Sequence, residues 1–339
     1  MFIDAVASTV ASLGRVSGLP VPPGGSPTMH IPDGFLSVPV SIAFWVISAV
    51  VVGYALHRVS RDLDERRVPL LAVLAAVIFA GQMLNFAVAG GTSGHLLGAT
   101  LAAILLGPWA AVVVMTAVVS IQALLFQDGG LLVLGANLFN MAVVGVFVGY
   151  GVYQLMSRAF KGRRTGVPVS GFTAAWVSIL AAALSCALQL ALSGTSPANL
   201  SVPAMAGIHA IIGVGEGLIT AGALAFVLAA RPDLVAAEAP ATAKRKALWI
   251  GGVAIAAILA VLSPLASTHP DGLEWVAEQQ GFLEAGLAPV YNIIPDYVFP
   301  GIANERLATI AAGIVGVLVV LTASWLAARG ARRRAAQSQ

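Results

Sequence analysis

Long apolar runs, each about the length of a helix that crosses a bilayer, follow one another along this chain. A membrane-spanning helix needs roughly 20 mostly apolar residues, and it satisfies its main-chain hydrogen bonds within the segment. Spans are predicted at about 38–56, 68–89, 95–107, 109–126, 133–156, 172–193, 204–229, 248–264 and 307–328. The third run is short and meets the fourth at Gly107-Pro108, which is typical of a tight turn. We therefore expect an all-α, polytopic membrane protein.

The composition agrees with a bilayer as the solvent. Hydrophobic residues make up 58% of the 339 residues and charged residues only 10%, whereas soluble domains carry roughly 25% charged residues. The single cysteine, Cys186, has no partner for an internal disulfide and excludes a structural zinc site built from thiolates. Nucleic acid is not expected as a partner, because the basic residues that produce the net charge of +3 are placed by membrane topology.

Basic residues indicate the orientation. Apart from Arg15 and Arg306, the lysine and arginine residues form four clusters, which follow the first, fifth, seventh and ninth spans. The clusters lie within 58–67, 158–164, 231–246 and 329–334. With nine spans all four fall on one side, and the positive-inside rule makes that side cytoplasmic. We therefore expect the N-terminus outside and the C-terminus in the cytoplasm; merging the third and fourth spans would put the later clusters outside.

The chain divides into segments of different character. They are an N-terminal extension (1–28), a seven-span core (29–230), a polar cytoplasmic linker (231–247), a two-span unit with an acidic extracytoplasmic loop (248–328) and a basic cytoplasmic tail (329–339). The extension lacks the basic start and the continuous apolar stretch of a secretory signal.

Polar side chains collect at the expected outer ends of the core spans, where burial is costly and polar groups tend to be functional. They are His30, Asp33, His95, Gln127, Asp128, Asn137, Asn140, His209 and Glu216. A single histidine is more often a hydrogen-bonded packing residue, and on the residues alone that alternative stays open. Three histidines at one depth favour a metal site, and imidazoles with few thiols suit nickel, cobalt, copper or zinc.

Enzyme motifs are missing from the sequence. It contains no HExxH, no GxxxxGK[ST] and no GxSxG. We expect a transport subunit that is not an enzyme and has no cofactor, so ATP hydrolysis for energised transport must reside on another subunit. The alternatives are an ATP-independent metal channel or facilitator and, more weakly, a membrane enzyme that uses a bound metal.

Four motifs in order resemble a known family. "MHIPDGFLS", "GTSGHLLGATLAAILLGPWAA", "QALLFQDGGLLVLGANLFNMA" and "HAIIGVGEGLIT", all within 29–230, resemble the cobalt/nickel substrate-capture component of energy-coupling factor transporters, the CbiM/NikM type. "HPDGLEWVAEQQGF" at 269–282 is similar to the PDGLE domain, the accessory subunit of the same branch, which is fused here.

The resemblance implies a site and partners. Its metal ligands would be the amine of Met29, the main-chain nitrogen and imidazole of His30, and His95, in a plane that suits Ni²⁺ or Co²⁺. Asp128, Asn140 and His209 are candidates for orienting those ligands. The implied partners are a transmembrane coupling subunit and cytoplasmic ATPase subunits, and the fused outer loop would help metal loading or the seating of the N-terminal segment. The residues do not choose between cobalt and nickel.

Met29 departs from the family pattern. The family begins at the methionine of MHIPDG, whereas here 28 residues precede it and make its nitrogen a peptide amide. Translation that starts at Met29, removal of the extension, or an altered site would each account for this, and we expect the first.

Overall fold

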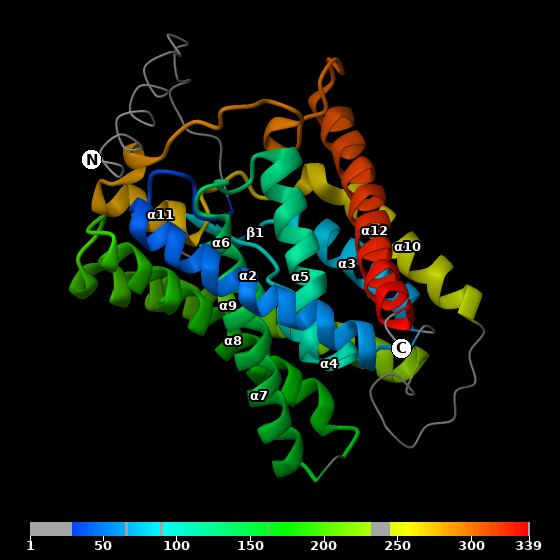
Figure 1. Ribbon diagram of the computed structural model, residues 1–339. Coiled ribbons are helices and arrows are strands. Elements are labelled where there is room, and N and C mark those ends of the chain that lie inside the picture. The colour runs from blue at the N-terminus through cyan, green and yellow to red at the C-terminus, as the bar shows by residue number, and fades with distance from the viewer. Residues whose placement is uncertain (1–28, 65–66, 89–90, 162, 232–244, 338–339) are drawn as a thin grey trace.

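The computed structural model describes residues 29–64, 67–88, 91–161, 163–231 and 245–337. Helices dominate it (Figure 1). The core contains α2 (Val38–Asp62), α3 (Val68–Gln82), α4 (Ala99–Leu106), α5 (Pro108–Ile121), α6 (Leu134–Leu138), α7 (Gly145–Ala159), α8 (Gly166–Leu192) and α9 (Ala198–Ala230). The second unit contains α10 (Arg245–Leu262), α11 (Gly272–Gln280) and α12 (Glu305–Gln337).

Short helical turns complete the elements. The π-helical turn η2 (Gln122–Phe126) continues α5, and a second one, η3 (Phe139–Val144), joins α6 to α7. Three 3₁₀ turns lie in the second unit: η5 (Ser263–Leu265), η6 (Leu283–Ala285) and η7 (Pro295–Tyr297). The turn η2 leads directly into the loop 127–133, and η3 follows that loop after α6. Such turns are often found at functional sites.

The polytopic architecture is confirmed. In the described ranges, six helical segments are long and apolar enough to cross a bilayer: Val38–Asp62, Pro108–Phe126, Leu134–Ala159, Gly166–Leu192, Ala198–Ala230 and Glu305–Arg333. Helix α3 and the apolar segment Trp249–Leu265 are shorter. The basic tail expected from residue 329 continues α12 as far as Gln337. The extension 1–28 and most of the linker, 232–244, lie outside the described residues.

The two spans expected at 68–89 and 95–107 are shorter than predicted. Helix α3 ends at Gln82, and α4 has only 8 residues. Between them, β1 (Phe86–Val88) pairs antiparallel with β2 (Thr92–Gly94). A short apolar run such as 86–88 fits a strand as well as a helix, and periodicity alone does not separate the two. The crossing between α3 and α5 is therefore part extended chain and part short helix.

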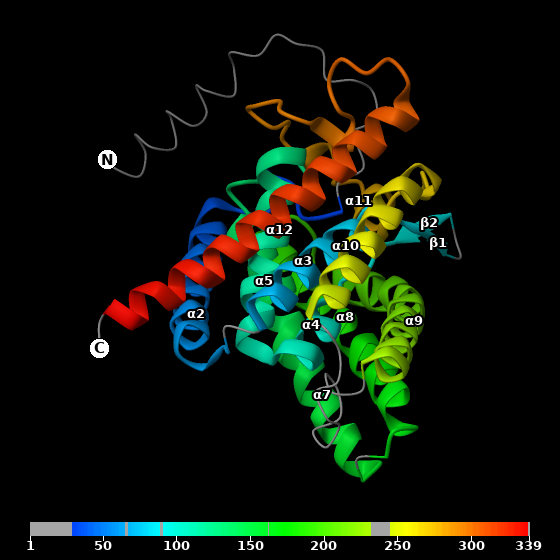
Figure 2. The same ribbon diagram turned by 90° about the vertical axis from the view of Figure 1, so that its right-hand side faces the viewer.

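The second unit packs on the core through α3. Both α10 and α12 contact α3, and they also contact each other (Figure 2). Small residues allow the close approach: a Cβ at Gly316 of α12 would lie 2.2 Å from the Phe79 ring, and one at Gly252 of α10 would lie 2.0 Å from Val73. On the other side of the core, α8 packs along α9 and α7 along α8.

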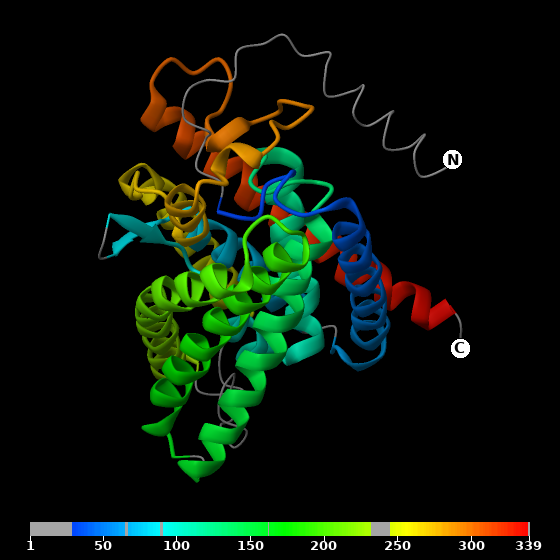
Figure 3. The same cartoon turned by 90° about the vertical axis from the view of Figure 1, so that its left-hand side faces the viewer.

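Four connecting segments lie toward one end of the long helices (Figure 3). They are 29–37, the two stretches 83–88 and 91–98, 127–133, and the loop 266–304 with its short helix α11, and main-chain hydrogen bonds join them. Gly130 N donates to Ile31 O at 3.0 Å, Ser93 N to Pro270 O at 2.8 Å, and Leu287 N to Asp33 O at 2.7 Å. The chain thus brings segments that are far apart in sequence to one site.

Candidate metal site

Two predicted ligand residues, Met29 and His30, contact the same carboxylate oxygen, that of Asp128. Met29 N donates a hydrogen bond of 2.8 Å to Asp128 Oδ1, and His30 Nδ1 lies 2.9 Å from the same atom. The His30 and Asp128 side chains are each about 3% exposed. Two nitrogen atoms of consecutive residues therefore point to one buried position.

The pair of His30 and Asp128 is electrostatically coupled. Burial alone would raise the pKa of Asp128, but the imidazole of His30 and the hydrogen bonds from His30 and Tyr297 outweigh it and hold the pKa below its usual range. Burial alone would lower the pKa of His30, but Asp128 outweighs that effect and raises it. The arrangement therefore favours a charged pair, in which the proton on His30 would compete with any metal ion that binds there.

Asn137 and Asp33 fix the segment that carries Met29 and His30. Asn137 accepts a hydrogen bond of 3.0 Å from Ile31 N at its side-chain oxygen and donates one of 3.0 Å from its side-chain nitrogen to Ile31 O. Asp33 accepts three hydrogen bonds from the main-chain nitrogens of 131–133. The sequence placed both residues among the polar side chains at the outer ends of the core spans. Their spacing did not predict that they fix the segment of Met29 and His30.

His95 comes to the same place on the extended loop. Its ring centroid lies 5.7 Å from that of His30, and its Nδ1 lies 3.1 Å from Leu96 O. His30 Nε2 is buried, and within the described part of the chain it makes no hydrogen bond. The structure therefore brings Met29, His30 and His95 together, as a shared ligand set requires.

Glu216 on α9 anchors the loop that follows His95. Its two carboxylate oxygens accept hydrogen bonds from Leu97 N at 2.7 Å and Gly98 N at 3.0 Å. The Glu216 side chain is fully buried. One turn earlier on α9, the Ile212 side chain packs closely against Gly94. A Cβ added to Gly94 would lie only 2.4 Å from it. Helix α9 thus holds the loop on both sides of His95.

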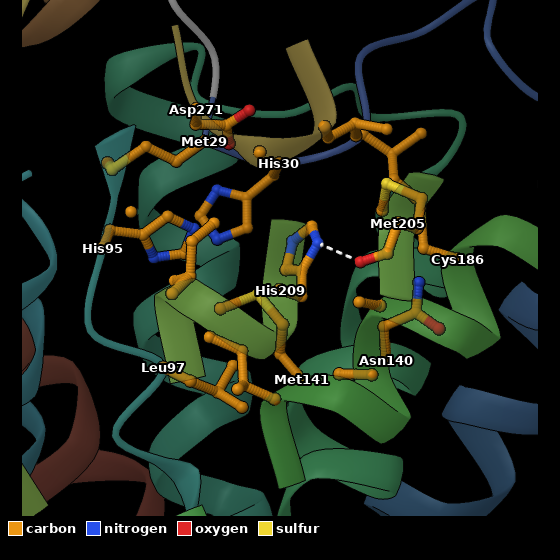
Figure 4. Close-up of a pocket in the computed structure, with 18 of the residues that line it drawn as sticks. Met29, His30, His95, Leu97, Asn140, Met141, Cys186, Met205, His209 and Asp271 are labelled. Atoms are coloured by element: carbon orange, nitrogen blue, oxygen red, sulfur yellow. Dashed lines mark hydrogen bonds between the residues drawn. The ribbon is translucent and has the colours of Figure 1, made fainter. Parts of the chain in front are cut away.

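A cavity of about 80 Å³ lies beside these residues (Figure 4). Met29, His30 and His95 line one part of it. His209, Met205, Cys186, Met141 and Asn140 line the remainder. Water occupies about 30 Å³ per molecule in the liquid, so the space suits an ion or a few water molecules.

His209 and Asn140 are wall residues of this cavity. The Nδ1 atom of His209 lies 2.9 Å from Met205 O (Figure 4). The side chain of Asn140 hydrogen-bonds Gln189 and Ser185. Of the three candidate orienting residues, Asp128 is the one whose hydrogen bonds reach Met29 and His30, whereas those of the other two point elsewhere.

Side chains alone do not make a complete metal site here. Among the described residues, no group of three or more His, Cys, Asp or Glu side chains is gathered closely enough to hold a metal ion. Two imidazoles, those of His30 and His95, lie near each other, and Met29 N is hydrogen-bonded to the Asp128 carboxylate that also contacts His30.

The outer loop of the second unit forms part of the cavity wall. Asp271 caps α11 by accepting a hydrogen bond of 2.8 Å from Glu274 N, and it lines the cavity with Gly272. Ser93 Oγ donates to His269 O at 2.8 Å and thereby ties this loop to the loop of His95. Burial raises the pKa of Asp271 to about 6. Sequence reasoning noted the acidic loop but did not place Asp271 at the site.

Comparison with known proteins identifies the family. Residues 30–234 match the family model of CbiM, the cobalt uptake substrate-specific transmembrane region, and residues 245–333 match the PDGLE domain. The chain belongs to the CbiM family. A relative from Archaeoglobus fulgidus, a putative fused nickel transport protein NikMN, is 38% identical over 307 residues, which cover 90% of this chain and 99% of the relative.

Other CbiM relatives agree. The fused nickel transport protein NikMN of Rhodobacter capsulatus is 34% identical over an alignment that covers 91% of this chain and 100% of that protein. The crystal structure of a truncated transition metal transporter superposes with a TM-score of 0.54 at 38% identity, over 60% of this chain and 99% of that one. The predicted fusion of a CbiM-type core with a PDGLE unit is confirmed, and so is a metal transport protein rather than an enzyme.

Proposed function

We propose that this CbiM-type protein is the metal-capture subunit of an energy-coupling factor transporter that imports Co²⁺ or Ni²⁺. The observation that carries the proposal is the convergence of Met29 N and His30 Nδ1 on one buried atom, Asp128 Oδ1, beside His95. Relatives named as nickel or cobalt transport proteins support the choice of cargo.

The ligands in this proposal are Met29, His30 and His95. Nitrogen atoms in a plane suit Ni²⁺, and a related arrangement holds Co²⁺. The main-chain nitrogen of His30 has to lose its proton, which coordination assists. Met29 contributes an amine if the mature chain begins there, and this start residue is part of the proposal.

The proposal places the captured metal at the outer side of the membrane. In support, Arg332 near the end of α12 donates to Leu63 O after α2, so two basic clusters meet on one face. The site segments lie at the opposite end of the helices in Figure 1. By the positive-inside rule the N-terminal end of the core is outside and the C-terminus is cytoplasmic. A transmembrane coupling subunit and paired ATPase subunits supply the energy.

Metal titration of the purified full chain tests the ligand assignment. We expect His30→Ala and His95→Ala each to weaken Ni²⁺ binding by at least tenfold, because each removes a proposed metal ligand. Removing only a residue that hydrogen-bonds a metal ligand typically lowers metal affinity about 10–100-fold. The control is His57→Ala, which alters a histidine near the other end of α2. Ni²⁺ affinity unchanged in both site variants would refute the assignment.

Uptake assays separate the proposed transporter from a facilitator. Cells that express the chain together with coupling and ATPase subunits should accumulate metal, and a catalytically inactive ATPase should abolish accumulation. Full-rate uptake by the chain alone in vesicles would instead establish an ATP-independent facilitator.

A further inference from the structure

Tyr297 belongs to the second unit, yet its side chain reaches the metal site of the core. Its hydroxyl donates a hydrogen bond of 2.6 Å to Asp128 Oδ2. The other oxygen of that carboxylate, Oδ1, accepts from Met29 N and lies beside His30 Nδ1. The two oxygens therefore have different partners, and the partner of Oδ2 comes from the outer loop of the fused unit.

The ring of Tyr297 is held in place by aromatic contacts. It stacks on Phe126, with centroids 4.7 Å apart and planes 13° apart. Phe126 in turn lies 5.4 Å from Phe79 of α3. Because Phe126 precedes Asp128 by two residues, the stacking that fixes the ring also fixes the hydroxyl next to the carboxylate.

The backbone around Tyr297 is also fixed by its surroundings. Asp296 and Tyr297 have φ values of 53° and 59°, a region that residues other than glycine adopt uncommonly. Such conformations persist where the surrounding structure imposes them, and they cluster at functional sites. Here Ile294 N donates to Leu125 O at 3.0 Å, which ties the segment to η2.

We infer that Tyr297 is a positioning residue for the metal site. Its hydroxyl fixes the Asp128 carboxylate, which in turn directs Met29 N and His30 Nδ1. When Nδ1 binds a metal ion, it has no proton to share with Asp128 Oδ1, whereas the hydrogen bond from Tyr297 to Oδ2 is kept. The carboxylate therefore remains oriented as its imidazole partner is taken by the cargo. The inference rests on the proposed ligand set.

Two tyrosines of one loop provide a matched test. Tyr291 donates to Ala123 O at the same end of α5 but does not reach Asp128. Tyr297→Phe keeps the stacked ring and removes only the hydroxyl, and Tyr291→Phe makes the same change nearby. With Ni²⁺ as the probe and the full chain in lipid nanodiscs, we expect Tyr297→Phe to raise the Kd about tenfold and Tyr291→Phe to leave it within about twofold. The ligand-field absorption band of bound Ni²⁺ should shift in Tyr297→Phe alone.

A double variant shows whether Tyr297 acts through Asp128. In an Asp128→Asn background, Tyr297→Phe should cause no further loss, because residues that act as a unit are not additive. An equal Kd in wild type, Tyr297→Phe and Tyr291→Phe, or an undiminished loss in the Asp128→Asn background, would overturn the inference. Failure of the ligand assignment is a different result: the His30→Ala and His95→Ala variants would then bind Ni²⁺ as well as wild type does.

Discussion

At the scale of single residues, the site depends on Asp128. This carboxylate links the N-terminal segment, through Met29 and His30, to the second unit, through Tyr297. A buried charge is tolerated when it is paired and hydrogen-bonded. Asp128 therefore keeps its charge, and in the proposed site it would make proton competition part of metal binding.

Asp128→Asn should change the pH dependence of metal binding. Metal binds His30 only when the imidazole has lost its proton, and Asp128 raises the pKa of that imidazole. Without the carboxylate charge, burial lowers the pKa, so the midpoint of Ni²⁺ binding should move to lower pH, while the maximal affinity falls by roughly tenfold. Titrations between about pH 5 and pH 8 measure this. A midpoint that stays in place or moves upward would contradict the role of Asp128.

The sequence predicted part of this residue-scale picture. Met29, His30, His95 and Asp128 stand in motifs that resemble those of a known family, and the structure brings them together. Tyr297 was missed because it meets Asp128 across 169 positions of the chain. No spacing or periodicity reports such a contact, since it depends on how the two units pack.

At the scale of elements, α9 and the loop of His95 act together. Glu216 accepts hydrogen bonds from two consecutive main-chain nitrogens, those of Leu97 and Gly98, at the start of α4. Because Glu216 of α9 accepts these two hydrogen bonds, the segment before α4 can remain extended where the sequence predicted a full-length spanning helix. Apolar periodicity showed the α9 span, but it could not show that a carboxylate within it replaces the missing helical hydrogen bonds of the loop.

Glu216→Gln tests this anchor. The variant keeps one acceptor but turns an amide N–H₂ group toward a main-chain N–H, and a buried unsatisfied group costs about 1–3 kcal/mol. We expect a lower thermal unfolding temperature and weaker Ni²⁺ binding. Thr220→Val, one turn along α9, is the control because the Thr220 hydroxyl is buried without a partner. Equal behaviour of the two variants would show that the anchor has no effect.

The burial of Asp271 and Glu274 gives the outer loop its own pH dependence. Burial raises the pKa of Asp271 to about 6 and that of Glu274 to about 8. Because both folded-state values lie above the ordinary ones, the folded loop binds protons more tightly, and its stability falls as pH rises through about 4 to 8. Asp271→Asn keeps a capping side chain and should flatten the lower part of this dependence in unfolding experiments. Glu284→Gln, an exposed change in the same loop, should leave the dependence as in wild type.

At the scale of the whole molecule, the second unit is integrated with the core. Helices α10 and α12 pack on α3, and Tyr297 of the loop between them reaches Asp128 of the core. The sequence predicted the fusion of the two units, but it overestimated the lengths of the spans that correspond to α3 and α4. It did not predict the packing on α3, because the small residues that permit it, such as Gly316, are common in membrane helices for many reasons.

Labelling with a membrane-impermeant maleimide tests the orientation. Cys186 is buried, so the background reaction should be low. In intact cells a Glu278→Cys variant should react, because α11 lies on the outer side in our proposal. An Arg61→Cys variant should react only in inside-out vesicles. The opposite pattern would reverse the membrane orientation and place the metal site at the cytoplasmic face.

Native mass spectrometry of the chain, purified from its own membrane after loading with Ni²⁺, tests the central claim most directly. It reports the first residue of the mature chain and the number of bound metal ions in one experiment. The account predicts a chain that begins at Met29, with a free amine as ligand, and carries one metal ion. A mature chain that retains residues 1–28 and holds the metal equally tightly would contradict the proposed role of the Met29 amine.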